Sequence, residues 1–366
     1  MKLNLEAPFN SVSLGQISYG VTNELFKKNV DLNIFPVMGN ADLGAYDKNS
    51  DYFNPRFSAA ANKAIHEYDN NIPSLKIWHI NQSWAKLSKK NYILTFHELD
   101  SVTQVEKNIL KSFDGIFVTS NFTKRVFEEN GINNVVFTPM GIDSTQNYPL
   151  NKEFFNDGSC VWSIIGKVEN LRKNTKNAIQ GWCKKFGNNS FHRLHLFVNN
   201  PFFKPEQMNA VFGEIFNGAP PPFNVKIFPH QPLNSQMNDA FNCTDIVIDL
   251  SRAEALSLPS LNCVALGKHA LIHHNTAFLD WATKDNATLI EPTGMVPAHD
   301  GIFFHSGQPF NQGNFFDCNL EEYDRKLDEV YIKWKTNKVN EEGKKLNDVY
   351  SYSNGVDIIL KTIFNN

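Results

Sequence analysis

Short runs of apolar and β-branched residues alternate with amphipathic segments along most of the chain. In the first half, strand patterns cover residues 2–6, 30–37, 75–80, 92–98, 115–120 and 134–139, and helical patterns cover 16–29, 101–113 and 120–131. Short apolar strands separated by amphipathic helices are typical of parallel sheets that are buried on both faces. The pattern therefore predicts a parallel α/β sheet.

Residues 140–159 interrupt this alternation with a polar stretch containing Gly and Pro, which is typical of a linker. The alternation then returns, with strand patterns at 160–167, 191–200, 223–230, 244–250 and 269–274 and helical patterns at 174–187, 205–216, 233–242, 259–267 and 276–284. We predict two Rossmann-like, doubly wound α/β domains, residues 1–150 and 151–345, with a ligand cleft between the carboxyl edges of their sheets.

The end of the chain has a different pattern. Residues 292–318 are rich in Gly and Phe and show no helical period, so we expect a long ordered loop or hairpin near the cleft. The tail that follows is predicted to be helical in two or three pieces.

Composition narrows the choice of function. The 366 residues are 42% hydrophobic and 20% charged, as in globular proteins, and the net charge is −3. This charge argues against broad electrostatic capture of nucleic acid or anionic membrane, although a local basic cleft remains compatible with it. No apolar run reaches the roughly 18 residues that span a bilayer, and the start resembles no signal peptide, so we expect a cytoplasmic protein.

The cysteines and histidines give no metal-site pattern. There are five cysteines, an odd number, and no two have the spacing of metal ligands. Reduced thiols are the default interpretation for Cys243 and Cys263, which lie in apolar helical patterns. We therefore predict neither a disulfide framework nor a metal centre.

One stretch with candidate chemistry is IIGKVENLRKNTKNAI, residues 164–179. Here a strand ends in glycine, and a basic loop with Lys167, Arg172 and Lys173 leads into a helix. Cations beside the free amides of a helix N-terminus form a site for phosphate or diphosphate. The alternative is an ordinary solvated basic loop.

A second stretch, SRAEALSLPSLNCVALG at residues 251–267, places one acid where a strand passes into a helix. Pro259 suits the first helical turn and Ser257 can cap it, so Glu254 falls in the loop above the sheet edge. There it could bind ligand hydroxyls while loop amides hold a phosphate. Alternatively, Glu254 caps the helix or pairs with Arg252.

Together the two stretches resemble the donor-binding domain of retaining GT-B glycosyltransferases of family 4, also called glycosyl transferases group 1. Lys167 stands where that family usually has Arg, and Lys173 keeps the family's six-residue spacing. Glu254 holds the first of two acidic positions, and Asn262 replaces the second. The sequence ALG at 265–267 closes the motif.

Similarity extends into the first half of the chain. Residues 118–143 look like the segment that ends the family's N-terminal domain, and residues 13–29 look like its glycine loop and first helix. The resemblance implies that Gly15 and Gln16 approach the donor phosphates and that His97 lines the acceptor side. For His97, a hydrogen-bonded structural role at the strand end is an equal alternative.

The resemblance implies transfer of a sugar from a nucleotide-diphosphate donor to an acceptor hydroxyl, with retention and without a metal or a cofactor. A UDP-sugar is the expected co-substrate. Glu254 would orient the sugar and Lys167, Arg172 and Lys173 would bind the diphosphate. The nucleotide side would be lined by Asn262, Ser260, Leu258 and His230. The last segment, 346–366, would cross back to the N-terminal domain, as in GT-B enzymes.

Several alternatives stay open. The acceptor is a saccharide, a lipid-linked sugar or a metabolite, or, as a minority hypothesis, a hydroxymethylated DNA base, because the chain is also similar to glycosyltransferases of T-even-like bacteriophages. A phage enzyme would work in the host cytoplasm, and DNA binding would draw on Lys86, Lys89, Lys90, Lys124 and Arg125. Rival functions are a GT-B nucleotide-sugar epimerase and a non-catalytic nucleotide-sugar-binding module. The oligomeric state is left open.

Overall fold

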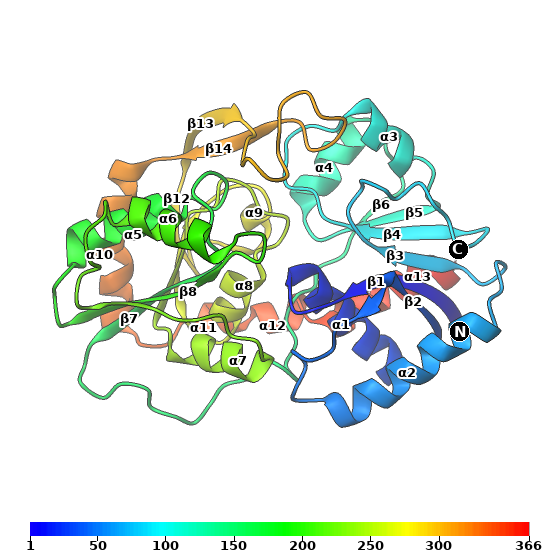
Figure 1. The fold of residues 1–366 in the computed structure, drawn as a ribbon, viewed down its shortest axis with the longest axis horizontal. Coiled ribbons are helices and arrows are strands. Elements are labelled where there is room, and N and C mark those ends of the chain that lie inside the picture. Colours follow the sequence, from blue (N-terminus) through cyan, green and yellow to red (C-terminus); the bar gives the residue numbers. More distant parts are fainter. Residues whose placement is uncertain (366) are drawn as a thin grey trace.

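The computed structural model describes residues 1–365, which form two six-stranded parallel sheets and a separate hairpin (Figure 1). The first sheet has the order β2-β1-β3-β4-β5-β6. Its strands are β1 (Lys2–Phe9), β2 (Asp31–Ala41), β3 (Ser74–Ile77), β4 (Asn91–Thr95), β5 (Gly115–Val118) and β6 (Val135–Phe137). Its helices are α1 (Ser13–Lys27), α2 (Ser50–His66), α3 (Gln104–Leu110) and α4 (Asn121–Glu129).

Helices cover both faces of this sheet. Along β4, Ile93 joins the apolar cluster formed with α3 and α4, and its neighbour Leu94 joins the cluster formed with α1 and α2 on the other face. Successive side chains of a strand point to opposite faces, so a strand buried on both faces must be apolar throughout. This explains the continuous apolar runs of the sequence.

The second sheet has the order β12-β11-β10-β7-β8-β9. Its strands are β7 (Cys160–Lys167), β8 (His192–Asn199), β9 (Val225–Ile227), β10 (Ile246–Asp249), β11 (His269–His273) and β12 (Thr288–Ile290). Its helices are α5 (Thr175–Phe186), α6 (Pro205–Ile215), α7 (Asn234–Cys243), α8 (Leu258–Ala265), α9 (Phe278–Trp281) and α10 (Leu320–Thr336). The winding direction reverses between β7 and β10, and ligands bind doubly wound sheets at such switch points.

The predicted doubly wound architecture is confirmed, but two elements were missed. Helix α2 has no counterpart among the predicted helical patterns. Its sixth residue is Pro55, which lacks the N–H that would bond back to Asp51, and a proline inside a helix normally disfavours it. Strand β12 has only three residues, too few to show a period.

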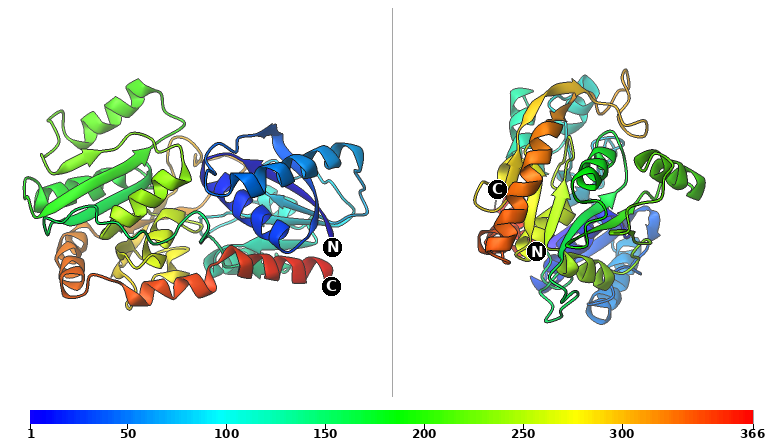
Figure 2. Two further views of the ribbon diagram at one scale, coloured as in Figure 1. Left: turned by 90° about the horizontal axis from the view of Figure 1, so that it is seen from below. Right: turned by 90° about the vertical axis from the view of Figure 1, so that its left-hand side faces the viewer.

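The C-terminal segment returns to the first domain. After α11 (Glu341–Lys344) and α12 (Leu346–Val349), helix α13 (Tyr352–Phe364) packs against α1 and β5 (Figure 2). This crossing runs beside the linker between the domains, where the Ile142 N–H donates to the Tyr350 carbonyl oxygen at 3.0 Å. The chain therefore passes between the domains twice, at adjacent places.

Besides the two crossings of the chain, a hairpin also connects the two domains. Strands β13 (Pro292–Pro297) and β14 (Asn314–Cys318) pair antiparallel, and we call residues 292–318 the arm (Figure 1). The backbone N–H and side-chain amide of Asn314 donate to the two carboxylate oxygens of Asp100 at 2.8 and 2.9 Å. Ser101 and Thr103 donate to carbonyl oxygens of the arm at 2.6 and 2.7 Å. The predicted hairpin is thus present, and it contacts both domains.

The structure also describes the cysteines and the apolar character of the helices. The cysteines are all free thiols, and Cys263 is fully buried. Among the residues that the structure describes, no helix combines the length and the apolar character that crossing a bilayer requires.

Replacing Gly20 by Ala should loosen the contact between α1 and α13, because a Cβ on Gly20 would lie 2.5 Å from the ring of Tyr352. Overpacking of this kind costs about 1–3 kcal/mol, so we expect a lower midpoint of urea unfolding. Gly213→Ala in α6 is the matched control, since nothing lies within 4 Å of its Cβ position. Equal midpoints for the two variants would contradict this packing.

Candidate functional site

The switch point of the second sheet brings the two candidate stretches together. Strand β7 ends at Lys167 and β10 ends at Asp249, and these two strands are hydrogen-bonded neighbours. The loops that follow them lead into α5 and α8 respectively. The residues that the sequence singled out in each loop therefore lie at the same sheet edge.

Glu254 forms ion pairs with two of the three candidate cations of the first stretch, Arg172 and Lys173. Its Oε1 accepts a hydrogen bond from Nη1 of Arg172 at 3.1 Å and also forms an ion pair with Nζ of Lys173. The side chains of Glu254 and Arg172 are only 8% and 9% exposed, so this charge group is largely removed from water. Arg252 instead pairs with Asp317, at 2.8 Å, which rules out the alternative pairing considered for Glu254.

The basic loop is shaped by Glu169, which sequence reasoning missed. Its two carboxylate oxygens accept the backbone N–H groups of Leu171, Arg172 and Lys173 at 2.6, 2.6 and 3.0 Å. Glu169 is 4% exposed. A buried carboxylate with three backbone donors fixes the loop conformation, and so directs the two cations toward Glu254.

Arg172 also reaches the first domain. Its Nη1 lies 3.7 Å from Oε1 of Glu98, which follows β4. Burial alone would lower the pKa of Arg172, but the carboxylates of Glu254, Glu98, Glu169 and Asp300 raise it above its ordinary value. The guanidinium therefore stays charged and links the two domains.

Lys167 differs from the other two cations. Among the described residues its ammonium group has no ion pair, and it lies 4.9 Å and 5.8 Å from the ring centres of Phe303 and Phe202. Burial lowers the pKa of Lys167, and the neighbouring charge of Arg172 adds to this shift. Lys167 is thus a cation that an anionic ligand can bind without displacing a carboxylate.

The start of α8 is a second candidate for binding an anion. Ser257 precedes the helix with a left-handed φ of 60°, and among the described residues no side chain caps the first turn, in which Pro259 has no N–H. The expectation that Ser257 caps α8 is wrong, because its hydroxyl donates to Asp249 at 2.6 Å. Ser260 donates to the same carboxylate at 2.8 Å. Amides at the start of a helix can bind a phosphate.

Asp249 is a half-buried acid beneath this helix start. Burial alone would raise its pKa, but the charge of Lys173 and the hydroxyl groups of Ser251, Ser257 and Ser260 lower it below the ordinary value. The ionised carboxylate holds these hydroxyls in place. Sequence reasoning missed Asp249, and Ser260, predicted to contact nucleotide, is already bonded to it.

Asn262 has other partners than the nucleotide contact predicted from the resemblance. Its side-chain amide donates to the carbonyl oxygens of Gly141 and Leu258 at 3.1 and 2.8 Å, and its Oδ1 accepts from Asn147 at 3.0 Å. Gly141 and Asn147 belong to the linker between the domains. In this chain Asn262 therefore ties α8 to the linker.

The candidate residues of the first domain, His97 and Gln16, also form hydrogen bonds with other residues of the protein. Nε2 of His97 lies 2.8 Å from the Ser101 carbonyl oxygen, so this nitrogen carries the donated proton. Gln16 exchanges two hydrogen bonds of 3.0 Å with Asn234 of α7. These contacts favour a positioning role for His97 and an interdomain role for Gln16.

Two more candidate residues, Gly15 and His230, lie outside the group formed by Glu254, Arg172 and Lys173. A Cβ on Gly15 would lie 2.1 Å from the carbonyl oxygen of Asn10, so the close approach of these backbone segments requires glycine. His230 is exposed in the loop between β9 and α7. No described contact joins either residue to Glu254.

The arm covers the charged group. Phe304 packs with Phe315 in a small apolar cluster that also includes Leu99 of the first domain and Ala253 beside Glu254. Its ring centre lies 5.9 Å from the Arg172 guanidinium. The arm thus places apolar surface over the ion pairs and separates them from water.

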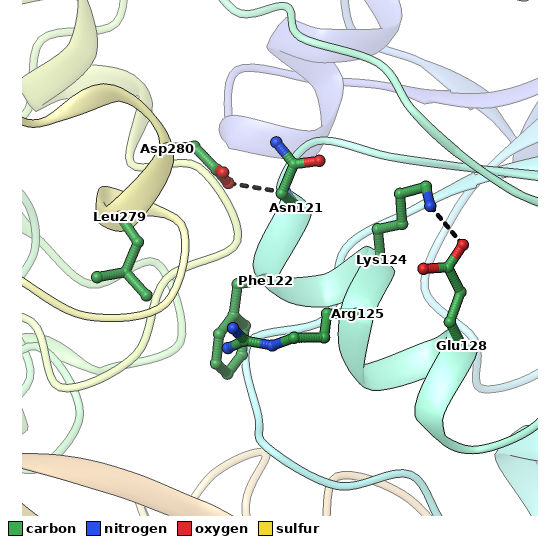
Figure 3. Close-up of a pocket in the computed structure, with 7 residues that line it drawn as sticks. All are labelled: Asn121, Phe122, Lys124, Arg125, Glu128, Leu279 and Asp280. Atoms are coloured by element: carbon green, nitrogen blue, oxygen red, sulfur yellow. Dashed lines mark hydrogen bonds and ion pairs between the residues drawn. The ribbon is translucent and has the colours of Figure 1, made fainter.

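A shallow pocket of about 320 Å³ lies elsewhere, between α4 and α9 (Figure 3). Its lining residues are Asn121, Phe122, Lys124, Arg125, Glu128, Leu279 and Asp280. Asp280 accepts the Asn121 N–H at 2.7 Å and so joins the two domains. None of the residues in the Glu254 charge group lines this pocket. Within residues 1–365, no group of three or more His, Cys, Asp or Glu is placed to hold a metal ion.

No protein-family model matches the chain, and no curated protein sequence matches it either. Solved structures do resemble it. Sucrose-phosphate synthase from Thermosynechococcus elongatus has a TM-score of 0.69 at 10% identity, over 100% of this chain and 98% of that one. A glycosyltransferase from Rickettsia africae gives 0.64 at 13% identity, over 100% and 99%.

A third similar structure is HepE from Anabaena, solved in complex with UDP and glucose. Its TM-score is 0.62 at 10% identity, over the full length of both chains. Likeness at such low identity shows the fold, because one fold hosts many functions. The predicted GT-B fold, with two Rossmann-like domains, is confirmed.

Replacing Glu169 by Ala should release the loop that carries Arg172 and Lys173, because three backbone donors lose their acceptor. Unsatisfied buried groups cost about 1–3 kcal/mol each, so we expect a loss of about 2–4 kcal/mol in unfolding free energy. Glu169→Gln keeps one carbonyl oxygen and should fall between Ala and the original protein in urea titrations. If neither Glu169→Ala nor Glu169→Gln changed the free energy of unfolding, the assigned role of Glu169 would be wrong.

Proposed function

We propose that this protein is a glycosyltransferase that moves a sugar from a nucleoside-diphosphate donor to an acceptor hydroxyl. One observation carries the proposal: Glu254 lies buried against Arg172 and Lys173 at the switch point of the second sheet, beside an uncapped helix N-terminus. An acid for sugar hydroxyls and cations for a diphosphate are thus only a few ångströms apart. The GT-B fold supports the same interpretation by analogy.

Negative charge grows on the diphosphate as the bond to the sugar breaks. In the proposal Lys167 and the first amides of α8 bind this charge, and Lys173 exchanges its contact with Glu254 for a phosphate oxygen. Removing one such preorganised donor typically costs 10²–10³-fold in rate. Lys167 needs no exchange of partners, since it has no carboxylate partner among the described residues.

Glu254 orients the sugar in this scheme. Both cations contact its Oε1, which leaves that oxygen a poor attacking group and the other oxygen available to sugar hydroxyls. A phosphate oxygen of the donor would take the acceptor proton on the face from which the leaving group departs. Transfer would therefore retain the anomeric configuration, as the family resemblance implies.

The donor is proposed to be a UDP-sugar. The resemblance implies such a donor, and a protein of similar fold was solved with UDP and glucose. The proposal includes no metal and no cofactor, because three cations and the helix amides provide charge for the leaving group. A cytoplasmic location, that of the host if the chain is viral, remains part of the proposal.

For the acceptor we propose a neutral saccharide or metabolite rather than DNA. The chain as a whole carries a net charge of −3, so it has no broad electrostatic attraction for a polyanion such as DNA. A modified DNA base remains the minority hypothesis.

UDP should raise the melting temperature of the protein, and Lys173→Ala should weaken UDP binding by about tenfold or more, the value of one charge-assisted hydrogen bond. Lys184→Ala, an exposed lysine of α5, is the charge-matched control and should bind UDP normally. Calorimetry with UDP, GDP and ADP measures these affinities and identifies the base.

Glu254→Gln should lower transfer by at least about 100-fold, because the sugar is no longer oriented. UDP binding should be unchanged or tighter, since the cations lose a competing charge. Transfer is measured with UDP-sugars and candidate acceptors, with release of UDP and the product anomer as readouts. Failure of every nucleoside diphosphate to bind would refute the donor site, and an epimerised nucleotide sugar without transfer would refute the transferase.

A further inference from the structure

The loop that carries Glu254 has no regular secondary structure, so other groups must hold it. Residues 251–257 lie between β10 and α8, and beneath them runs the loop that follows β11. That second loop contains Asn275 and Thr276, which are 1% and 0% exposed. Polar side chains so deeply buried require partners.

Their partners are backbone groups of the Glu254 loop. The Glu254 N–H donates to Oγ1 of Thr276 at 2.9 Å, and the carbonyl oxygen of Glu254 accepts the Ala277 N–H at 3.2 Å. The residue is therefore fixed through its own main chain on both sides of its Cα. These contacts do not involve its carboxylate, which remains available to the cations.

The hydrogen bonds continue to the start of the same loop. The Thr276 hydroxyl donates to Oδ1 of Asn275 at 2.9 Å, and Nδ2 of Asn275 donates to the carbonyl oxygen of Ser251 at 2.9 Å. Nδ2 of Asn275 also donates to the His273 carbonyl oxygen at 3.0 Å. One short network thus ties both Ser251 and Glu254 to the end of β11.

Thr276 forms these hydrogen bonds from an unfavourable backbone conformation. Its φ is 44°, in the left-handed region that β-branched residues rarely enter, and such strain costs on the order of 1–3 kcal/mol. Glycine would relieve the strain and valine would fill the same volume. Neither supplies a hydroxyl that accepts from Glu254 and donates to Asn275.

We propose that Thr276 is a positioning residue, whose hydroxyl sets the position of Glu254 against Arg172 and Lys173. As a role in transfer, this rests on the proposed function. As a statement about the loop, it stands on the hydrogen bonds alone. A displacement of about 1 Å at a reacting group can cost 10²-fold in rate, so loss of the hydroxyl should reduce turnover more than binding.

The test compares Thr276→Val, which keeps shape and branching but loses the hydroxyl, with Thr276→Ser, which keeps the hydroxyl. Thr288→Val is the matched control, because Thr288 is 2% exposed and its Oγ1 has no hydrogen-bond partner within the part of the chain that the structure describes. All three changes are made in the full chain. Melting curves first establish that each variant is folded at the assay temperature.

The first readout is hydrogen exchange at the Glu254 amide. We expect exchange about tenfold faster in Thr276→Val, and within about threefold of the original protein in Thr276→Ser and Thr288→Val. The proposal is overturned if Thr276→Val leaves this exchange unchanged, or if Thr288→Val accelerates it equally. This readout requires no substrate, so it holds whatever the protein transfers.

The second readout is kinetic and uses the UDP-sugar and acceptor identified by the transfer assay. We expect kcat to fall about 10–100-fold in Thr276→Val with KM for the donor within about threefold, and Thr276→Ser to recover most of kcat. Equal losses in the Ser and Val variants would overturn the positioning role. An original protein that binds UDP-sugars without transferring would refute the proposed function, while hydrogen exchange would still decide the role of Thr276.

Discussion

The burial of Glu254 with Arg172 and Lys173 is the constraint on which the rest of the site depends. Taking an unpaired charge out of water costs several kcal/mol, so these three groups must meet with good geometry. Glu169 holds the loop of the two cations, and Thr276 holds the loop of the acid. The start of α8 and Lys167, which has no ion pair among the described residues, then provide groups that a ligand can bind.

The same group links the two domains. Arg172 faces Glu98 of the first domain, and the arm packs Phe304 over the guanidinium while Asn314 holds Asp100. These contacts hold the two domains together beside the Glu254 charge group, and the arm places apolar side chains over it. Exclusion of water would protect a reactive donor from hydrolysis and strengthen every electrostatic contact in the site.

The sequence predicted much of the fold, because buried parallel strands leave continuous apolar runs, and it brought Glu254 and Lys173 to one sheet edge because both follow central strands. It did not reveal Glu169, since a glutamate in a polar loop looks like any solvated acid. The sequence also did not predict the hydrogen-bond partners of Asn262 and Gln16 in the other parts of the chain. They lie in the linker and in α7, and the Gln16–Asn234 pair spans 218 positions of the chain, a separation at which local patterns carry no information.

The most direct test of the account is a crystal structure of the protein with UDP bound. We expect the diphosphate at the switch point of the second sheet, with phosphate oxygens about 3 Å from Nζ of Lys167 and from N–H groups at the start of α8. A diphosphate bound in another place, such as the pocket between α4 and α9, would contradict it. So would a protein that binds no UDP at millimolar concentration.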